Sequence, residues 1–539
     1  MRKAHLRVLG SIAALVVGAL CSVALANEAS TLSSDQVGPG AMPPEIAPIT
    51  APFEMGDLAK PHFGDRRVAL ELNSAKQRTT LVTRDIQVAI DQLSAAGGGT
   101  LVLPEGEWLT GRVELKSGVN LHVPRGTTLN FSGQVEDYLP VVQTRYEGTE
   151  VMSVGALIYA RDAHRIAVTG GGKLVGPKSG PLREARKGLI DDLLDTSVPV
   201  EQRVMDGRNG RHYLRPQFVC LLDCREVLIE GVTLRNSPMW NIVPIYCEQV
   251  IVRGVTIESQ EVVNGDGVNI VSCRNVLVEY CSTNTGDDCY ALKAGRGEDG
   301  LRTSKPVENV VLRFNHSTGG TGGIAFGSET AGGIRDIYAH DCVFEGVRHA
   351  VYIKTRRPRG GGGERINIER VRFTATYHGV LIDMIGLPMY VGELGNRLPR
   401  REHTRLTPFY RDLTIRDLEG TCATGNALKI KGIPESPASD LLFERLSITG
   451  PGLPNLADVA DCEFVDCTFR AEQPALKFLD AVRVMYENCR LVVADGLPEI
   501  EVSGPQSKDI AFSNVTPPLS GDNVRLHDGA EPSSVQIQQ

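Results

Sequence analysis

The sequence is poor in aromatic residues, which make up only 5% of its 539 residues, and it has no excess of basic charge. With few rings available, the core must be filled chiefly by aliphatic side chains. A formal net charge of −8 and an isoelectric point near 5.9 give no indication of nucleic-acid binding. Beyond residue 20, no apolar run approaches the roughly 18 residues of a membrane-spanning helix. We therefore expect neither nucleic acid nor a membrane as a partner.

The first 26 residues have the features of an export signal. Arg2, Lys3 and Arg7 form a basic start, residues 8–20 are mostly apolar, and Ala24-Leu-Ala26 offers a small-residue cleavage site. We expect residues 1–26 to be a signal peptide that directs the protein to the periplasm or the cell exterior.

The sequence also has few cysteines at the spacing typical of metal sites. Twelve cysteines are present, and eleven remain after the predicted signal peptide, so they cannot all pair within one chain. Close pairs with the spacing of metal ligands are almost absent. We expect most of these cysteines to be buried as small apolar residues and one or two pairs to form disulfides. We expect the protein to bind neither a metal nor another cofactor.

What the sequence does contain is a repeat. Short Val/Ile/Leu-rich segments recur, each introduced by a polar pair, and their starts are separated by 23, 26, 34, 27 and 29 residues. The segments begin at Arg225, Glu248, Arg274, Glu308, Arg335 and Glu364. Each has the alternation of a strand, and no helical pattern lies between them. Such units must stack to bury their apolar faces. The sequence therefore predicts an all-β fold, a right-handed single-stranded parallel β-helix.

The ends of this solenoid are predicted from composition. Residues 83–96 carry Ile86, Ala89, Ile90 and Leu93 on one helical face before three glycines, which is typical of a short helix that caps the first coil. We expect a linker at residues 27–60, one β-helix domain at 61–515, and a polar C-terminal tail at 516–539. A monomer is the favoured state.

Three carboxylates stand one coil apart. Asn264-Gly-Asp266-Gly and Gly286-Asp287-Asp288-Cys are 20 to 22 residues apart, so they should lie over one another on adjacent coils. Crowded carboxyls repel, which raises the pKa of one while another stays ionised. An inverting glycosidase needs such an acid and base. Turn-stabilising aspartates and a calcium site remain alternative interpretations.

A basic segment follows within two coils. Residues 345–372 contain eight Lys or Arg and three Glu in an otherwise acidic chain. A cationic strip beside a carboxylate cluster suits an anionic polysaccharide, such as a chain of uronic acids, although a solvated Gly-rich loop would look the same.

Ordered motifs identify the family. From about Thr83 to Gly379 the sequence resembles the family 28 glycoside hydrolases, the polygalacturonase-like pectin hydrolases. The motifs are Ala95-Ala-Gly-Gly-Gly-Thr-Leu-Val-Leu-Pro104, Asp137-Tyr-Leu-Pro-Val-Val142, Arg145-Tyr-Glu-Gly148, Ser237-Pro-Met-Trp240, Asn264-Gly-Asp266-Gly, Thr285-Gly-Asp-Asp-Cys289 and Gly327-Ser-Glu329. The resemblance implies a right-handed parallel β-helix and inverting hydrolysis of α-galacturonosyl linkages without a metal.

The resemblance also implies roles for single residues. Asp287 would be the general acid, Asp266 and Asp288 would hold and deprotonate the attacking water, and Lys354 would bind a substrate carboxylate. Asn264 would orient its neighbours or bind substrate. Because Arg145-Tyr-Glu-Gly148 is similar to exo-acting bacterial members, Arg145 is grouped with the substrate-binding residues and release from chain ends is expected.

The sequence departs from the family pattern at two positions. Thr321 stands where the family has His, and Tyr352 stands where it has Arg. An Arg fork binds a carboxylate at two points, whereas Tyr offers one hydroxyl group. His349, or one of Arg356 and Arg357, could substitute in part.

Three hypotheses remain open on the sequence alone. The first is a hydrolase of galacturonate-containing pectin, with a rhamnogalacturonan or other branched linkage as its variant. The second is a polysaccharide lyase, which would need calcium and an Arg or Lys base. The third is a non-catalytic pectin-binding solenoid.

Overall fold

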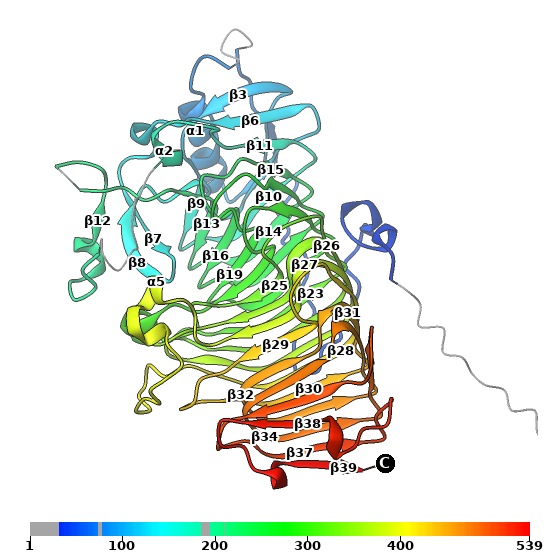
Figure 1. The fold of residues 1–539 in the computed structure, drawn as a ribbon. Coiled ribbons are helices and arrows are strands. Elements are labelled where there is room, and N and C mark those ends of the chain that lie inside the picture. Colours follow the sequence, from blue (N-terminus) through cyan, green and yellow to red (C-terminus); the bar gives the residue numbers. More distant parts are fainter. Residues whose placement is uncertain (1–31, 74–77, 185–193, 210, 539) are drawn as a thin grey trace, which may run out of the picture. The chain divides into compact units, whose positions relative to one another are not determined.

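The computed structural model describes residues 32–73, 78–184, 194–209 and 211–538. The predicted signal peptide lies outside these residues. The described chain winds into stacked coils whose strands pair in parallel with strands of the coils before and after (Figure 1). Parallel strands connected within one sheet have right-handed crossovers. The predicted all-β, right-handed parallel β-helix is confirmed.

Each coil in the first half contributes one strand to each of three parallel sheets, called sheets 1, 2 and 3 here. Sheet 1 contains β9 (Ala156–Arg161), β13 (Gln217–Leu222), β16 (Ile242–Ile245), β19 (Val268–Val271), β22 (Tyr290–Lys293) and β25 (Gly322–Phe326). Sheet 2 contains β5 (Val119–His122), β10 (His164–Thr169), β14 (Arg225–Glu230), β17 (Glu248–Arg253), β20 (Arg274–Glu279) and β23 (Val307–Arg313). Sheet 3 contains β6 (Thr127–Phe131), β11 (Lys173–Val175), β15 (Thr233–Arg235), β18 (Thr256–Ser259), β21 (Ser282–Thr285) and β24 (His316–Ser317).

Later strands bend from one sheet into the next. The long strands β26 (Ile334–Lys354) and β27 (Gly362–Asp383) pair along almost their whole length. The coils that follow are built from β28 (Phe409–Cys422), β29 (Leu428–Lys431), β30 (Ala438–Glu444), β31 (Ser447–Gly452), β32 (Asn455–Val465), β33 (Thr468–Gln473), β34 (Ala475–Glu487), β35 (Arg490–Val493), β36 (Glu499–Ser503) and β37 (Lys508–Ser513).

The predicted repeat corresponds to the strands of sheet 2, which are paired so that equivalent positions of successive repeats lie side by side. Arg225 lies beside Glu248, and Glu248 beside Arg274, so that the polar pairs stack residue for residue. Two residues further along each strand, Val227 and Val250 are stacked and buried. Burying such a ladder on successive coils provides the hydrophobic free energy that no single coil could supply.

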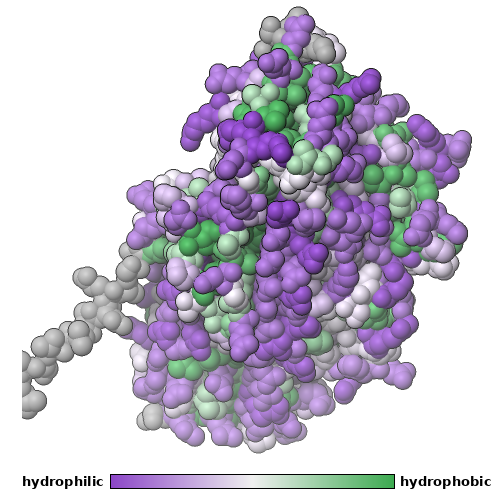
Figure 2. All heavy atoms as spheres, turned by 180° about the vertical axis from the view of Figure 1, so that it is seen from behind, coloured by the Kyte–Doolittle hydropathy of each residue, from purple (hydrophilic) through white to green (hydrophobic). Residues whose placement is uncertain are grey.

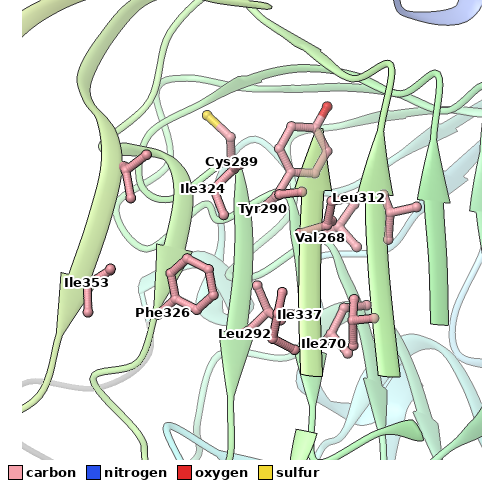
Figure 3. Packing of buried hydrophobic residues seen from close by; sticks show 14 of the residues in the cluster. Val268, Ile270, Cys289, Tyr290, Leu292, Leu312, Ile324, Phe326, Ile337 and Ile353 are labelled. Atoms are coloured by element: carbon pink, nitrogen blue, oxygen red, sulfur yellow. The ribbon is translucent and has the colours of Figure 1, made fainter. Parts of the chain in front are cut away.

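Sheet 1 has one face inside the solenoid and one face outside. In β22, Tyr290 and Leu292 point into the core, where they meet Ile324 and Phe326 of β25 (Figure 3). Because side chains alternate along a strand, Lys293 of β22 must point outward. This alternation sets the outer face of sheet 1 apart as a surface for polar chemistry.

The cysteines follow the prediction only in part. All eleven described cysteines are buried, as expected, but all are free, so the expected one or two disulfides are wrong. The Sγ atoms of Cys247 and Cys273 instead donate to main-chain carbonyl groups of Leu221 and Pro244 at 3.1 and 3.3 Å. These thiols serve as small, hydrogen-bonded core residues at the corners between coils.

The N-terminal helix forms where the sequence predicted it. Helix α1 (Thr83–Ala95) buries Ile86, Ile90 and Leu93 against the core of the first coils. It ends before Gly98, whose φ of +107° and close approach to Gly118 leave no room for a side chain.

Both predicted boundaries of the domain need correction. Residues 32–60 are not a free linker, because Arg253 and Arg313 donate hydrogen bonds to the carbonyl groups of Pro43 and Pro48. Residues 516–538 are not a tail: β38 (Val524–His527) pairs with β36, and β39 (Val535–Gln538) pairs with β37. The polar composition hid these strands because only alternate residues face the core.

The side of the molecule opposite to Figure 1 is largely hydrophilic, with hydrophobic residues in separate small groups (Figure 2). Among the described residues, no helix has the length and apolar character required to cross a membrane.

Candidate active site

A cleft of about 690 Å³ lies over the outer face of sheet 1. Its lining residues come from β22, β29 and the last residues of β26 and β27, and from the turns before and the loops after the strands of sheet 1. Eight of the nine sequence-predicted site residues line it: Asn264, Asp266, Asp287, Asp288, Thr321, His349, Tyr352 and Lys354. The stacked coils therefore bring together residues that are up to 90 positions apart in the sequence.

The three carboxylates occupy the turns that lead into β19 and β22. Val268 pairs with Tyr290, which puts Asp266 beside Asp288 on adjacent coils, as the spacing predicted. Asp266 and Asp288 are 2% and 1% exposed, whereas Asp287 is partly open to the cleft. Gly286 makes this turn possible, because a Cβ there would lie 2.1 Å from the carbonyl oxygen of Val262.

Two ammonium groups hold this carboxylate cluster together. Lys354 Nζ donates to Asp288 Oδ2 at 2.7 Å. Lys293 Nζ lies 3.4 Å from Asp266 Oδ2 and 3.9 Å from Asp288 Oδ2. Asp287 has no ion-pair partner within 4 Å among the described residues. The two buried carboxylates are thus matched with cations, and the more exposed one is not.

The pKa values of these carboxyl and ammonium groups depend on burial and on the neighbouring charges. Burial raises the pKa of the Asp287 carboxyl, and the neighbouring Asp288 raises it further. Burial, with the charges of Asp287 and Asp288, also raises the pKa of Asp266 well above its ordinary value, although Lys293 opposes this. Burial alone would lower the pKa of Lys354, but Asp288 beside it raises that pKa above its usual value. Lys354 is therefore a permanent cation, and Asp287 is suited to retain a proton.

One oxygen atom on each buried carboxylate is unused. Asp266 Oδ1 and Asp288 Oδ1 are buried and have no hydrogen-bond partner among the described residues. A buried carboxylate oxygen without a partner is costly unless water or a ligand satisfies it. Two such atoms on adjacent coils, beside the cleft, can hold a water molecule between them.

The residues that depart from the family pattern form a patch next to this cluster. The rings of His349 and Tyr352 are 4.8 Å apart, and Lys354 Nζ lies 4.3 Å from the centre of the Tyr352 ring. Burial, followed by the charges of His378 and Arg348, lowers the pKa of His349 to about 3. His349 is therefore neutral at ordinary pH and does not replace the charge of the absent arginine. The main-chain N–H of Thr321 donates to the carbonyl of Asp287 at 2.9 Å.

Arg145 is not where the sequence predicted it. Its guanidinium is buried outside the cleft, where it donates to the carbonyl of Gly148 at 3.2 Å and to Ser272 Oγ at 2.9 Å. It fastens the hairpin of β7 (Val142–Tyr146) and β8 (Thr149–Ser153) to the solenoid. The hairpin tip, Glu147, lines the cleft instead. Arg145 is therefore a positioning residue.

The remaining arginines and Asn264 have separate environments. Arg356 lines the cleft, whereas Arg357 is buried and paired with Glu435. Asn264 Oδ1 accepts a hydrogen bond of 2.7 Å from Arg215, which fixes its side chain at the rim.

Sequence reasoning gave no role to several charged residues of the cleft, among them Lys293, Arg296, Glu329 and Arg359. Lys293 could have been found, because the strand alternation that hides Tyr290 and Leu292 turns Lys293 outward. Glu329 was recognised as part of a motif but received no role. The positions of Arg296 and Arg359 depend on loop paths that alternation does not predict.

The arrangement does not suit a calcium ion. Two lysines already neutralise the buried carboxylates, and among the described residues no group of three or more His, Cys, Asp or Glu has a metal-binding arrangement. A carboxylate set with its own ammonium partners is better suited to moving protons.

Comparisons with known proteins agree with this geometry. The family model described as glycosyl hydrolases family 28 matches residues 205–470. A probable polygalacturonase of Vitis vinifera is 27% identical over 391 residues, covering 68% of this chain and 71% of the relative. An exo-poly-alpha-D-galacturonosidase of Dickeya chrysanthemi is 26% identical over 432 residues, covering 72% of this chain and 68% of the relative.

A solved structure also matches most of the chain. The hyperthermoactive exopolygalacturonase of Thermotoga maritima is 30% identical, with a TM-score of 0.65, and the match covers 81% of this chain and 93% of that one. The chain is a glycoside hydrolase, and it belongs to glycosyl hydrolases family 28.

Proposed function

We propose that this protein hydrolyses α-galacturonosyl linkages in pectic polysaccharide with inversion of configuration, working from chain ends. The observation that carries the proposal is the carboxylate cluster: two buried aspartates on adjacent coils with unused oxygens, beside a third that has no cation of its own. Inverting glycosidases need an acid on one side of the linkage and a base with room for water on the other.

The three aspartates divide the reaction between them. Asp287 donates its proton to the glycosidic oxygen as the bond from that oxygen to the anomeric carbon breaks. Water held by Asp266 and Asp288 attacks that carbon from the opposite face and gives a proton to Asp288. Asp288 is the principal base because its Oδ1 atom has no partner and can accept the proton, while Lys354 holds Oδ2. One water molecule is consumed; Asp288 then releases its proton to solvent, and solvent returns one to Asp287.

The charges in the cleft support an acidic sugar chain as substrate. Lys354, Arg348, Arg356, Lys429 and Lys431 line it. In all, eight Lys or Arg and six Asp or Glu line the cleft, and an excess of positive charge attracts anionic ligands. Relatives named as polygalacturonase and exo-poly-alpha-D-galacturonosidase support the same substrate class.

The β7–β8 hairpin supports action at chain ends. Its tip reaches the rim of the cleft, where the carbonyl of Gly148 accepts a hydrogen bond from the main-chain N–H of Arg296 at 3.4 Å. This contact makes the tip a wall rather than a free loop. A cleft walled on one side would favour an exposed chain end over the middle of a polymer.

A panel of substrates tests the proposal. Purified protein would be incubated with polygalacturonate, rhamnogalacturonan and short galacturonate oligomers, while reducing ends and product sizes are followed. We expect monomer or dimer from polygalacturonate from the earliest times, and loss of hydrolysis by orders of magnitude in Asp287→Asn. Early release of long oligomers would contradict exo action. Reaction with rhamnogalacturonan alone would favour a second function, to which the Tyr352 substitution points, on a branched or mixed pectic linkage.

The predicted signal peptide, residues 1–26, supports action outside the cytoplasm. Protein recovered from the periplasm or the medium should begin at Asn27 when its N-terminus is sequenced. Protein that keeps its first residues and stays in the cytoplasm would contradict export.

A further inference from the structure

Three arginines gather around one glutamate at the rim of the cleft. Arg296 follows β22, while Arg356 and Arg359 follow β26, and all three line the cleft together with Glu329. Lys293 Nζ lies 3.7 Å from Glu329 Oε2, and the same nitrogen contacts Asp266. This arginine cluster, defined as Arg296, Arg356 and Arg359, therefore lines the same cleft as the carboxylates and is connected to them through Glu329 and Lys293.

Two of these guanidinium groups keep unused donors. Arg356 Nε and Arg359 Nη1 are buried and have no hydrogen-bond partner among the described residues. Arg356 does donate to Ser328 Oγ, at 2.8 Å through Nη2, and its guanidinium carbon lies 4.7 Å from the ring centre of Tyr390. The side chain is thus held in place at the cleft, while one of its donors, Nε, is buried and unsatisfied.

The cluster has more positive than negative charge. Burial, with Arg359 next in effect, lowers the pKa of Arg296 to about 9. The pKa of Glu329 is lowered to about 2, because Lys293, Arg359 and Arg296 outweigh the effect of burial. Glu329 and Glu147 are the acidic groups that raise the pKa of Arg359 against its burial. Three closely packed guanidinium groups thus share two carboxylates, and an incoming anion would relieve their repulsion.

We propose that Arg356 and Arg359 bind the carboxylate of the galacturonate unit next to the cleaved linkage. This inference rests on the proposed function and names the residues that would select a uronic acid over a neutral sugar. A guanidinium fork matches a carboxylate at two points. The pair supplies the two-point recognition that a tyrosine at position 352 cannot, from the loop that directly follows the strand of Tyr352.

A purely structural role for the cluster makes a different prediction. If the arginines only join the hairpin tip to the loop after β26, their loss would loosen the cleft for every ligand alike. If they bind a carboxylate, their loss would affect uronic acids alone. The distinction can be measured as binding, without turnover.

The test uses Asp287→Asn as a non-hydrolysing background and isothermal calorimetry as the readout. The ligands are an α-linked galacturonate trimer and the neutral galactose trimer of the same linkage. We expect Arg356→Gln and Arg359→Gln each to weaken trigalacturonate binding by about tenfold to a hundredfold, as for hydrogen bonds to charged groups. Binding of the neutral trimer should stay unchanged. Arg356→Lys, which keeps charge but loses the fork, should recover only part of the affinity.

The controls separate the possible failures. Arg411→Gln removes an arginine that pairs with Glu364 outside the cleft, and it should bind both trimers as the background does. Equal weakening for both trimers, or none in either arginine variant, would overturn the carboxylate site. Failure of the background protein itself to bind trigalacturonate would instead contradict the proposed function. Melting temperatures identify a variant that fails to fold. If Arg356→Gln does not fold, the binding of the two trimers by Arg356→Lys tests the proposal in its place.

Discussion

The separate roles of the three aspartates depend on Lys293, to which we assign no contact with the substrate. Lys293 lies beneath them, its ammonium within 4 Å of Asp266, Asp288 and Glu329. It also lies 4.7 Å from the ring centre of Trp240, which limits its movement. Burial raises the pKa of Asp266 well above its ordinary value, and the charge of Lys293 opposes this rise. Lys293 therefore acts as a positioning residue that limits the protonation of Asp266.

Replacing Lys293 by methionine should change the pH profile of the enzyme. Without the ammonium the pKa of Asp266 rises further, so the carboxyl that holds the attacking water together with Asp288 would stay protonated up to a higher pH than in the wild type. We expect the acidic limb of kcat to move upward by about one to three pH units, the usual effect of one nearby charge. Lys305→Met, which removes a surface lysine paired with Asp223, is the matched control. An unshifted limb with an intact fold would contradict this role.

The two stacked histidines predict how stability depends on pH. The pKa of His349 is lowered to about 3 and that of His378 to about 4, in both cases mainly by burial. The unfolded chain binds protons at these positions below about pH 6.5, whereas the folded protein does not. Their contribution to stability is therefore complete above pH 6.5 and declines as the pH falls towards 4.

Urea unfolding at several pH values measures this effect. We expect His349→Asn to flatten the fall in unfolding free energy between pH 6.5 and pH 4, whatever its effect at neutral pH. His62→Asn serves as a control, because His62 lies outside the cleft. A slope identical to that of the wild type would show that His349 is not buried as a neutral group.

The residues of the site differ in how far the sequence predicts them. The sequence predicts the carboxylate cluster because Asp266 precedes Asp287 and Asp288 by one coil. Stacking of adjacent coils then places the three side chains together. Arg145 was grouped with the substrate-binding residues because its motif is similar to exo-acting members of the family, but in the structure Glu147 of that motif lines the cleft instead. A motif indicates that a segment takes part, and only packing decides which of its side chains faces outward.

Among elements, the β7–β8 hairpin determines the form of the cleft. Gly148 at its tip has a φ of +86°, and a Cβ there would lie 2.7 Å from Glu329 Cγ. The tip can rest on the rim of the cleft only because this residue has no side chain. The hairpin and the arginine cluster are therefore packed as one unit.

Gly148→Ala should lower activity by pushing the hairpin tip away from Glu329. Gly496→Ala is a close control, since Gly496 has a φ of +78° but nothing within 4 Å of its added Cβ. Both variants carry backbone strain, but only the first disturbs the cleft. We expect a loss of kcat/KM and longer products from Gly148→Ala alone, measured on polygalacturonate. Equal behaviour of the two variants would show that the hairpin does not shape the cleft.

At the scale of elements, the repeated strands were the most predictable feature. Arg225, Glu248 and Arg274 stack as their spacing indicated, because each polar pair marks the same corner of the coil. Strands such as β38 were missed, since a terminal coil needs only Val524 and Leu526 facing inward. A pattern of two apolar residues is too short to distinguish from a loop.

For the molecule as a whole, the last coil closes the solenoid. β38 and β39 cover β36 and β37, whose backbone groups would otherwise form an exposed edge. A chain that ends at residue 515 should therefore melt at a lower temperature and associate more readily than the full chain. Calorimetry and light scattering measure both effects. Unchanged melting and no association would support the tail that the composition suggested.

The central claim is inverting hydrolysis by the aspartate cluster, and the configuration of the first product tests it most directly. Proton NMR of galacturonate oligomers during digestion distinguishes the two anomers before they equilibrate. Cleavage of an α-linkage by water held between Asp266 and Asp288 should give the β-anomer first, and Asp287→Asn should give almost no product. Initial formation of the α-anomer, or an unsaturated sugar from elimination, would contradict the account.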